Sequence, residues 1–115
     1  MTPISVPPAH DARPTPVQLA MFRTQLEEQR QFRLEQLEEL RALDPGHLSE
    51  VTDALAAGAR AAMHDVRTAL HRMDTGSYGT CTDCGALLAI ERLEVLPQVG
   101  QCLPCRREAS VSAER

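Results

Sequence analysis

The four cysteines of the chain fall into two Cys-x-x-Cys pairs, and no other feature restricts the fold as strongly. The pairs are separated by 17 residues (85–101) and consist of Cys81 with Cys84 and Cys102 with Cys105. A separation of roughly 15–20 residues is typical of a four-thiolate zinc site. Zinc takes four ligands at tetrahedral corners, and two intervening residues let one tight turn present both sulfurs of a pair to the same ion. We therefore expect the four cysteines to hold one structural zinc ion.

Three other uses of the cysteines remain as alternatives. Two structural disulfides would need an oxidising compartment, and the N-terminus shows no signal-peptide pattern. A thioredoxin-like redox pair would be expected where a strand meets a helix in a βαβ unit, and the sequence lacks that pattern. Iron also suits four thiolates. With four protein ligands no position is open for water, so a structural ion is favoured over a catalytic one.

The composition limits both the core and the kinds of partner. The 115 residues include two Phe, one Tyr and no Trp, so a large aromatic core is not expected and zinc can supply part of the folding free energy. The formal net charge is −4, whereas binding to nucleic-acid backbone calls for clustered Lys and Arg. No apolar run approaches the ~20 residues of a membrane-spanning helix. We expect a cytoplasmic protein that inserts into no membrane and does not bind DNA in a sequence-specific way.

Four segments are expected along the chain. Residues 1–14 contain four prolines and few bulky apolar side chains, which predicts a disordered tail. Residues 15–74 are expected to form a helical hairpin with a turn near 44–49. The C4 zinc finger should then occupy residues 75–107 and a C-terminal tail residues 108–115, with residues 106–115 forming either a brief helical extension or a frayed end.

The first helix of the hairpin is expected to begin at a capping box and to run to about Leu43. Thr15 can cap it, Pro16 suits the first helical position, and Gln18 completes the capping-box pattern. Apolar residues then recur mostly at steps of three and four, which predicts one apolar stripe on a helix. These residues are Leu19, Phe22, Leu26, Leu34, Leu37 and Leu40.

A second helix is expected from about Ser49 to Met73. Pro45 disfavours a helical conformation at Asp44, and Gly46 frees the backbone to turn; either Asp44 or Ser49 could cap the second helix. Its expected stripe consists of Leu48, Val51, Leu55, Ala59, Ala62, Val66, Leu70 and Met73. Two helices of similar length with one narrow stripe each should pack antiparallel, like a two-stranded coiled coil.

The finger itself offers two local predictions. Gly85 directly follows the first cysteine pair, where a tight turn favours a residue free to take positive φ. The segment 90–96 should form a short helix that Pro97 ends. The predicted fold class is thus mainly α, a long antiparallel helical hairpin attached to a small C-terminal four-cysteine zinc finger with a short helix.

No catalytic constellation is present, but the tip of the hairpin is a second candidate site. The four histidines are scattered, and no phosphate-binding glycine loop follows a strand, so an enzyme is not expected. Asp44, Glu50 and Asp53 form an acidic cluster near the predicted turn. A charged tip suits insertion into a narrow cavity of a partner. Carboxylates in a first helical turn are also favoured by the helix dipole alone, by about 0.3–1 kcal/mol, and both interpretations stay open.

Three segments in the C-terminal third carry a family resemblance. They are Tyr-Gly-Thr-Cys-Thr-Asp-Cys-Gly at 78–85, Glu-Arg-Leu-Glu-Val-Leu-Pro at 91–97, and Cys-Leu-Pro-Cys at 102–105. Together they resemble the DksA/TraR C4-type zinc finger proteins, whose pattern is a G-x-Y-G-x-C-x-x-C-G run, an R-L-x-A-x-P helix and a closing C-x-x-C. Val95 stands where that pattern has alanine. The resemblance is specific over residues 69–107.

The resemblance implies a transcription regulator that binds bacterial RNA polymerase at its secondary channel rather than DNA, with the hairpin tip acting near the active centre. In the family the tip carries Asp-x-x-Asp-x-Ala. Asp53 matches the second acid, while Glu50 replaces the first and Leu55 replaces the alanine. The alarmone ppGpp is a candidate effector by the same resemblance.

Three alternatives to this function are retained. One is a zinc-ribbon adaptor whose hairpin binds a different protein, or a second copy of itself. Another is DNA binding through the finger, for which Arg92, Arg106 and Arg107 are the nearest cations in the sequence. A third is redox sensing, since oxidation of the thiolates would release zinc and disorder the base of the hairpin.

Overall fold

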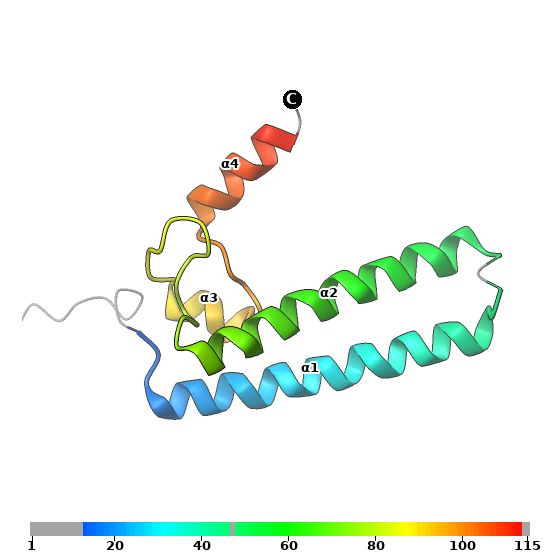
Figure 1. Ribbon diagram of the computed structural model, residues 1–115, viewed down its shortest axis with the longest axis horizontal. Coiled ribbons are helices and arrows are strands. Elements are labelled where there is room, and N and C mark those ends of the chain that lie inside the picture. Colours follow the sequence, from blue (N-terminus) through cyan, green and yellow to red (C-terminus); the bar gives the residue numbers. More distant parts are fainter. Residues whose placement is uncertain (1–12, 47, 114–115) are drawn as a thin grey trace, which may run out of the picture.

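The chain folds into a two-helix arm that projects from a small cysteine-containing base (Figure 1). The structure is a computed structural model that describes residues 13–46 and 48–113. Within these residues there is no β-strand, only an isolated antiparallel bridge between Thr80 and Leu87. The molecule measures 69 × 38 × 24 Å along its principal axes. Its helices are α1 (Pro16–Leu43), α2 (Glu50–Thr75), α3 (Ile90–Val95) and α4 (Leu103–Ala113).

Helix α1 begins and ends where local sequence signals predict. The Thr15 hydroxyl accepts a hydrogen bond from the Gln18 N–H (3.1 Å), and the Gln18 side chain accepts one from the Thr15 N–H (2.9 Å). The reciprocal pair satisfies two backbone donors at the helix N-terminus. At the other end, the Asp44 N–H donates to the Leu40 carbonyl (3.0 Å). The capping box and the end at Leu43 are both confirmed.

The turn between α1 and α2 is closed by Asp44, and α2 is capped by Ser49. The Asp44 carboxylate accepts from the Leu48 N–H (3.1 Å) and the Ser49 N–H (2.9 Å). The Ser49 hydroxyl accepts from the Thr52 N–H at 3.4 Å. Of the two candidate caps, Ser49 therefore takes the cap position. Helix α2 ends at Thr75 and is capped by Gly76, whose φ of 80° lets the backbone leave the helix in the left-handed conformation.

The two long helices pack side by side, as the fold class predicts, but the packed face of α2 differs from the predicted stripe near the tip. Ala59, Val66 and Leu70 are buried, as expected. Leu48 and Leu55, in contrast, are 92% and 50% exposed, and Val51 is also exposed. The residues of α2 that are buried instead form a series in the steps of three and four expected for one helical face: Ala56, Ala59, Met63, Val66, Ala69 and Leu70.

The difference between the predicted and the observed buried face of α2 has a geometric reason. A helix turns about 100° per residue, so Leu55 lies well away from the direction in which the adjacent Ala56 points. The predicted stripe followed the bulkiest side chains, which near the tip are Leu48, Val51 and Leu55. The structure packs small alanines against α1 there. The stripe of α1 is closer to the prediction, with Phe22 and Leu26 buried and its remaining members partly buried.

The hydrophobic core lies where the root of the hairpin meets the finger. The rings of Phe22 on α1 and Tyr78 in the finger lie 6.0 Å apart, centroid to centroid, at 49°. The Tyr78 hydroxyl also donates to the Pro97 carbonyl at 2.8 Å. Arm and finger therefore share a single core. Its buried members are Phe22, Leu26, Val66, Ala69, Leu70, Tyr78, Cys81, Leu88, Ile90 and Leu93.

Polar contacts reinforce the same junction. The Arg72 guanidinium, in the last turn of α2, donates to the Ser77 carbonyl (2.8 Å) and to the Thr80 hydroxyl (2.9 Å). An ion pair of 2.9 Å between Arg23 on α1 and Asp74 on α2 links the two helices at their base. The direction in which the arm leaves the finger is thus held by both apolar and polar contacts.

The N-terminal end of the described chain departs from the expected disordered tail, whereas the C-terminal end takes the helical one of its two expected forms. Arg13 donates to the Gly76 carbonyl at 2.7 Å, and Pro14 packs so closely that a Cβ added at Gly79 would lie 3.0 Å from its ring. These two residues, assigned to the disordered tail by composition, are placed against the finger by tertiary contacts; residues 1–12 lie outside the described residues. Helix α4 extends through most of the predicted C-terminal tail, to Ala113.

No helix in the described ranges is both long and apolar enough to span a membrane.

Candidate metal centre and hairpin tip

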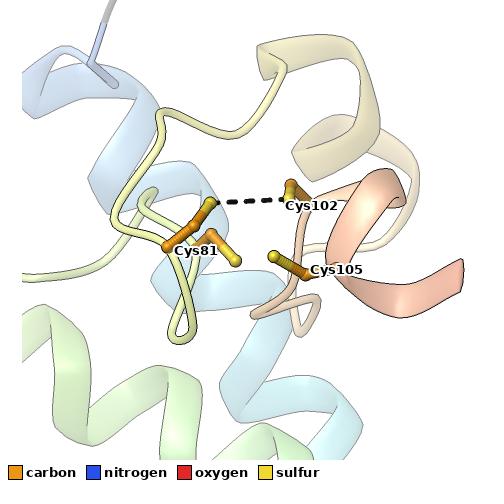
Figure 2. Close-up of side chains that lie close together, drawn as sticks. Cys81, Cys102 and Cys105 are labelled. Atoms are coloured by element: carbon orange, nitrogen blue, oxygen red, sulfur yellow. Dashed lines mark hydrogen bonds between the residues drawn. The ribbon is translucent and has the colours of Figure 1, made fainter. Parts of the chain in front are cut away.

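The structure brings the four cysteines of the two pairs together. Cys81 and Cys84 lie on the loop that follows α2, Cys102 directly precedes α4, and Cys105 lies in the first turn of α4. The four Sγ atoms all lie within 4.8 Å of one another. Figure 2 shows Cys81, Cys102 and Cys105 converging from separate segments of the chain. The arrangement offers four sulfur ligands to one ion.

The spacing of the sulfurs fits a tetrahedral ion and not a disulfide. The Sγ atoms of Cys84 and Cys102 are 3.7 Å apart. Around zinc, with a metal–sulfur distance of about 2.3 Å, two corners of a regular tetrahedron lie about 3.8 Å apart. A disulfide would bring its sulfurs to about 2.05 Å, and all four cysteines are free. The donor set therefore fits one zinc ion.

The turn around the first pair is built as the sequence predicts. Gly85 has a φ of 77°, in the left-handed region that favours glycine. Its N–H donates to the Cys81 carbonyl at 3.0 Å, and the Cys81 N–H donates to the Ala86 carbonyl at 2.7 Å. Within the turn, the Asp83 N–H donates to the Cys81 sulfur at 3.4 Å. The backbone thus both folds the turn and directs a donor at a ligand atom.

A second set of hydrogen bonds fixes the two cysteine turns relative to each other. The Thr82 N–H donates to the Gly100 carbonyl at 2.8 Å. The Gln101 side-chain amide donates to the Asp83 carboxylate, and the Arg92 guanidinium donates to the Gln101 carbonyl at 2.9 Å. Residues 100 and 101 directly precede Cys102, so the second pair is positioned from the first and from α3.

The surroundings shift the pKa values of the thiols in opposite directions. Burial opposes ionisation of Cys81, but backbone N–H groups of Cys102, Cys84 and Asp83 outweigh it and lower its pKa to about 6. The pKa of Cys105 is raised, chiefly because its thiol shares hydrogen bonds with Cys102 and then Cys84. Without a cation the cluster therefore retains protons. An arriving Zn²⁺ would displace them, because it binds thiolates.

The acidic cluster lies at the opposite end of the hairpin from the cysteines (Figure 1), and its members differ in their contacts. Asp44 is half-buried, and its carboxylate oxygens accept from backbone N–H groups of the turn. Glu50 and Asp53 are exposed in the first turn of α2. Asp44 thus has a structural task in the turn, while Glu50 and Asp53 are exposed at the surface of the tip.

The structure also shows apolar side chains on the surface of the tip. Leu48 and Val51, which the predicted stripe places in the interior, are exposed beside Glu50 and Asp53, together with Leu43. The sequence spacing of Leu48 and Val51 resembles that of a packed stripe, so no local signal separates them from core residues. Only the position of α1 against α2 shows that they face outward.

Comparison with known proteins identifies the C-terminal region. Residues 76–110 match the family model described as the prokaryotic dksA/traR C4-type zinc finger. Among curated proteins, the chain is similar to the RNA polymerase-binding transcription factor DksA of Haemophilus influenzae, with 33% identity over 52 residues.

Both sequence matches cover only part of this chain. The aligned region covers 45% of this chain and 36% of the Haemophilus protein, so the chain spans little more than a third of that relative. No solved structure gives a significant match. The matched segment contains all four cysteines, the Gly85 turn and α3. In its residues 76–110, the chain therefore carries a zinc finger of the prokaryotic DksA/TraR C4 type, with one zinc ion as its cofactor.

Proposed function

We propose that this protein is a transcription regulator that binds bacterial RNA polymerase at the secondary channel, with the hairpin tip directed toward the active centre. In this proposal it acts in the cytoplasm, through polymerase and without reading DNA sequence. The observation that carries the proposal is the DksA/TraR-type finger joined through one core to a projecting hairpin. The name of the Haemophilus relative, an RNA polymerase-binding factor, supports the choice of partner.

The shape and charge of the arm support the proposed mode of action. The long helices form a slender projection whose free end is the turn between α1 and α2 (Figure 1). Glu50 and Asp53 are exposed in the first turn of α2, directly after that turn. Contacts of Phe22, Tyr78 and Arg72 hold the arm to its base. An arm that keeps its direction can deliver a tip into a narrow channel without first losing much conformational entropy.

We propose Cys81, Cys84, Cys102 and Cys105 as the ligands of the zinc ion, in a structural role. When bound, zinc would tie the two cysteine turns together. Four thiolates leave no coordination position for a substrate, which supports a regulator rather than an enzyme. The thiolates also adjoin the core that roots the arm, since Cys81 is one of its buried members.

Titration of purified polymerase with the zinc-loaded full chain tests this proposal. We expect saturable binding at micromolar concentration and a change in transcription initiation. The double variant Glu50→Ala with Asp53→Ala should lose the effect on initiation and keep both its zinc and its helical circular dichroism. The matched control is Glu27→Ala with Glu28→Ala, two exposed acids near the middle of α1 and away from the tip turn. Parallel titrations with ppGpp test it as an effector.

Absence of polymerase binding by the zinc-loaded protein would reject the proposal. Equal loss of activity in the tip variant and the control variant would reject the assigned role of the tip. Binding that persists only at low salt, with DNA competing for it, would instead indicate a nonspecific electrostatic interaction.

A protein–protein adaptor is the second candidate, and exposed apolar side chains favour it. Met21 and Phe32 are exposed on the outer face of α1, and Leu48 and Val51 are exposed at the tip. Exposed apolar patches often mark protein contact sites. Affinity capture from the native cell extract separates the candidates, because an adaptor would retain a specific partner other than polymerase.

A further inference from the structure

One side of the hairpin carries a groove with an apolar floor. Two adjoining hollows of about 340 and 110 Å³ lie between α1 and α2, and Leu37 and Arg60 line both. We call the two hollows together the hairpin groove. Its floor includes Met63, which is buried, and Leu34 and Leu37, which are half-buried. These side chains leave apolar surface accessible from one side of the arm.

The rim of the hairpin groove is basic. Arg41 on α1 and Arg60 and Arg67 on α2 line it, and all three are exposed. No carboxylate occurs among the described residues that line either hollow. This is unexpected from composition alone, because the chain has 16 acidic and 12 basic residues. A local concentration of positive charge therefore surrounds the apolar floor.

The contacts of the three rim arginines differ from those of the arginines at the root of the arm. Over the described residues, none of them forms a hydrogen bond or an ion pair. Arg23 and Arg72, in contrast, are both engaged at the root of the arm. Arg60 and Arg67 lie seven residues apart, about two helical turns, and so project from the same side of α2. Their charges are available to a ligand that runs along the arm.

We propose that the hairpin groove binds an acidic amphipathic α-helix of a partner protein. Apolar residues of that helix would pack on Leu34, Leu37 and Met63, and its flanking carboxylates would pair with Arg41, Arg60 and Arg67. Recognition of an amphipathic helix by an apolar groove is an established mode, and arginine binds carboxylates bidentately. The proposal is separate from the polymerase proposal, because it uses one side of the arm and not the tip.

Two other occupants are weaker fits. A nucleic acid would satisfy the arginines, but its backbone has no apolar side to cover the leucines. A second copy of this chain could offer the outer face of α1, where Glu28 and Glu35 flank Phe32, which is 59% exposed. On that face the exposed Met21 and Phe32 lie eleven residues, roughly 16 Å, apart, so it presents isolated apolar side chains and no continuous stripe to the apolar floor. A helix with a continuous apolar stripe therefore fits the hairpin groove better.

Synthetic peptides provide a direct test on the zinc-loaded full chain. The probe is a helical peptide of roughly 20 residues, long enough at 1.5 Å per residue to span both hollows. It carries leucine in one stripe and glutamate at the flanking positions. One control peptide replaces every glutamate with lysine, and another keeps the composition but scatters the leucines. Fluorescence anisotropy measures binding of each.

The matched protein variants separate the groove from general basic charge. Arg60→Glu with Arg67→Glu reverses the rim, while Arg106→Glu with Arg107→Glu reverses two exposed arginines on α4. We expect the acidic peptide to bind saturably, the rim variant to weaken binding at least tenfold, and the α4 variant to change it less than about twofold. Circular dichroism and zinc content should be equal in all three proteins.

Several results would overturn the proposal. Binding of the lysine peptide or the scattered peptide as strongly as the acidic one would remove charge or apolar pattern as the basis of recognition. An unchanged affinity in the rim variant would place the site elsewhere. Displacement of the peptide by an oligonucleotide at physiological salt would assign the groove to nucleic acid. Self-association in sedimentation that the rim variant abolishes would assign it to a second copy.

Discussion

Tyr78 joins three parts of the molecule through one side chain. Its ring contacts Phe22 of α1, and its hydroxyl donates to the Pro97 carbonyl beyond α3. Burial raises the pKa of Tyr78 above its ordinary value. The chain has one Tyr and no Trp, so near-ultraviolet absorbance of a phenolate reports on this single contact.

We expect Tyr78 to resist ionisation in the folded protein. Its folded-state pKa is raised above the unfolded value of about 10. The stability from the buried neutral phenol is therefore fully present below a pH of about 10 and is lost as pH rises from there toward the folded pKa. Alkaline titration of phenolate absorbance, with helical circular dichroism followed in parallel, measures this. Ionisation near the unfolded value with intact helices would contradict the buried environment.

Two glycines give a matched pair with opposite expected effects. A Cβ at Gly85 or at Gly58 would meet no atom of a more distant residue within 4 Å, so neither substitution causes a tertiary clash. Gly85 has a φ of 77°, where an L-residue costs about 1–2 kcal/mol, so Gly85→Ala should lower the free energy of unfolding by that amount. Gly58 lies inside α2, where alanine should add about 0.5–1 kcal/mol. Urea unfolding of both zinc-loaded variants measures these changes. If the free energy of unfolding changes with the same sign in both variants, this explanation is wrong.

At the scale of the helices, the register of α2 against α1 determines which side chains are buried. Along α2 the buried positions are mostly alanines near the tip and larger residues near the root. Helix α1 likewise has its buried Phe22 and Leu26 in the half nearer the root. The arm is therefore packed most heavily where it meets the finger, and more lightly toward the tip.

The register predicts very different costs for two leucine truncations. Leu26 is 0% exposed, so Leu26→Ala should remove about 2–5 kcal/mol from the free energy of unfolding. Leu55 is half exposed beside the packed face, so Leu55→Ala should change it by no more than about 0.5 kcal/mol. Chemical denaturation of both variants compares them. Similar costs would mean that Leu55 packs against α1 after all.

At the scale of the whole molecule, the metal centre and the arm depend on each other. Cys81 belongs to the same core as Phe22 of α1 and Leu70 of α2, and Cys102 and Cys105 pack against that core. Zinc ligation is therefore expected to stabilise the residues that orient the arm as well as the finger. Loss of a cysteine ligand should therefore also destabilise the packing of α1 and α2.

Removal of zinc tests this dependence. Freshly purified, reduced protein should contain about one zinc per chain. A strong chelator should lower the thermal midpoint and reduce helical circular dichroism, and restored zinc should reverse both changes. The single variant Cys84→Ser, at the exposed member of the set, should lower zinc content without truncating a buried side chain. A metal-free protein with an unchanged unfolding transition would contradict the structural role of the ion.

Features that depend on near neighbours along the chain are determined by the sequence itself. The Thr15 capping box, the turn at Gly85, the ends of α1 and the start of α3 depend on groups only a few residues apart, and the local sequence predicts each of them correctly. The cysteine spacing belongs to the same class, because each pair acts through one tight turn. The presence of a four-cysteine zinc finger was therefore predictable from the sequence.

Tertiary structure alone decided what depends on distant partners. Arg13 donates a hydrogen bond to Gly76, which lies 63 residues away in the sequence. The composition around Arg13 holds no sign of this contact and therefore places Arg13 in a disordered tail. The rotation of α2 against α1 buries Ala56 and leaves Leu55 half exposed. Arg60 and Arg67 line a groove only because α1 supplies part of its floor. Local hydrogen bonding and ligand spacing are encoded over a few residues, whereas packed faces and grooves arise only when separate elements meet.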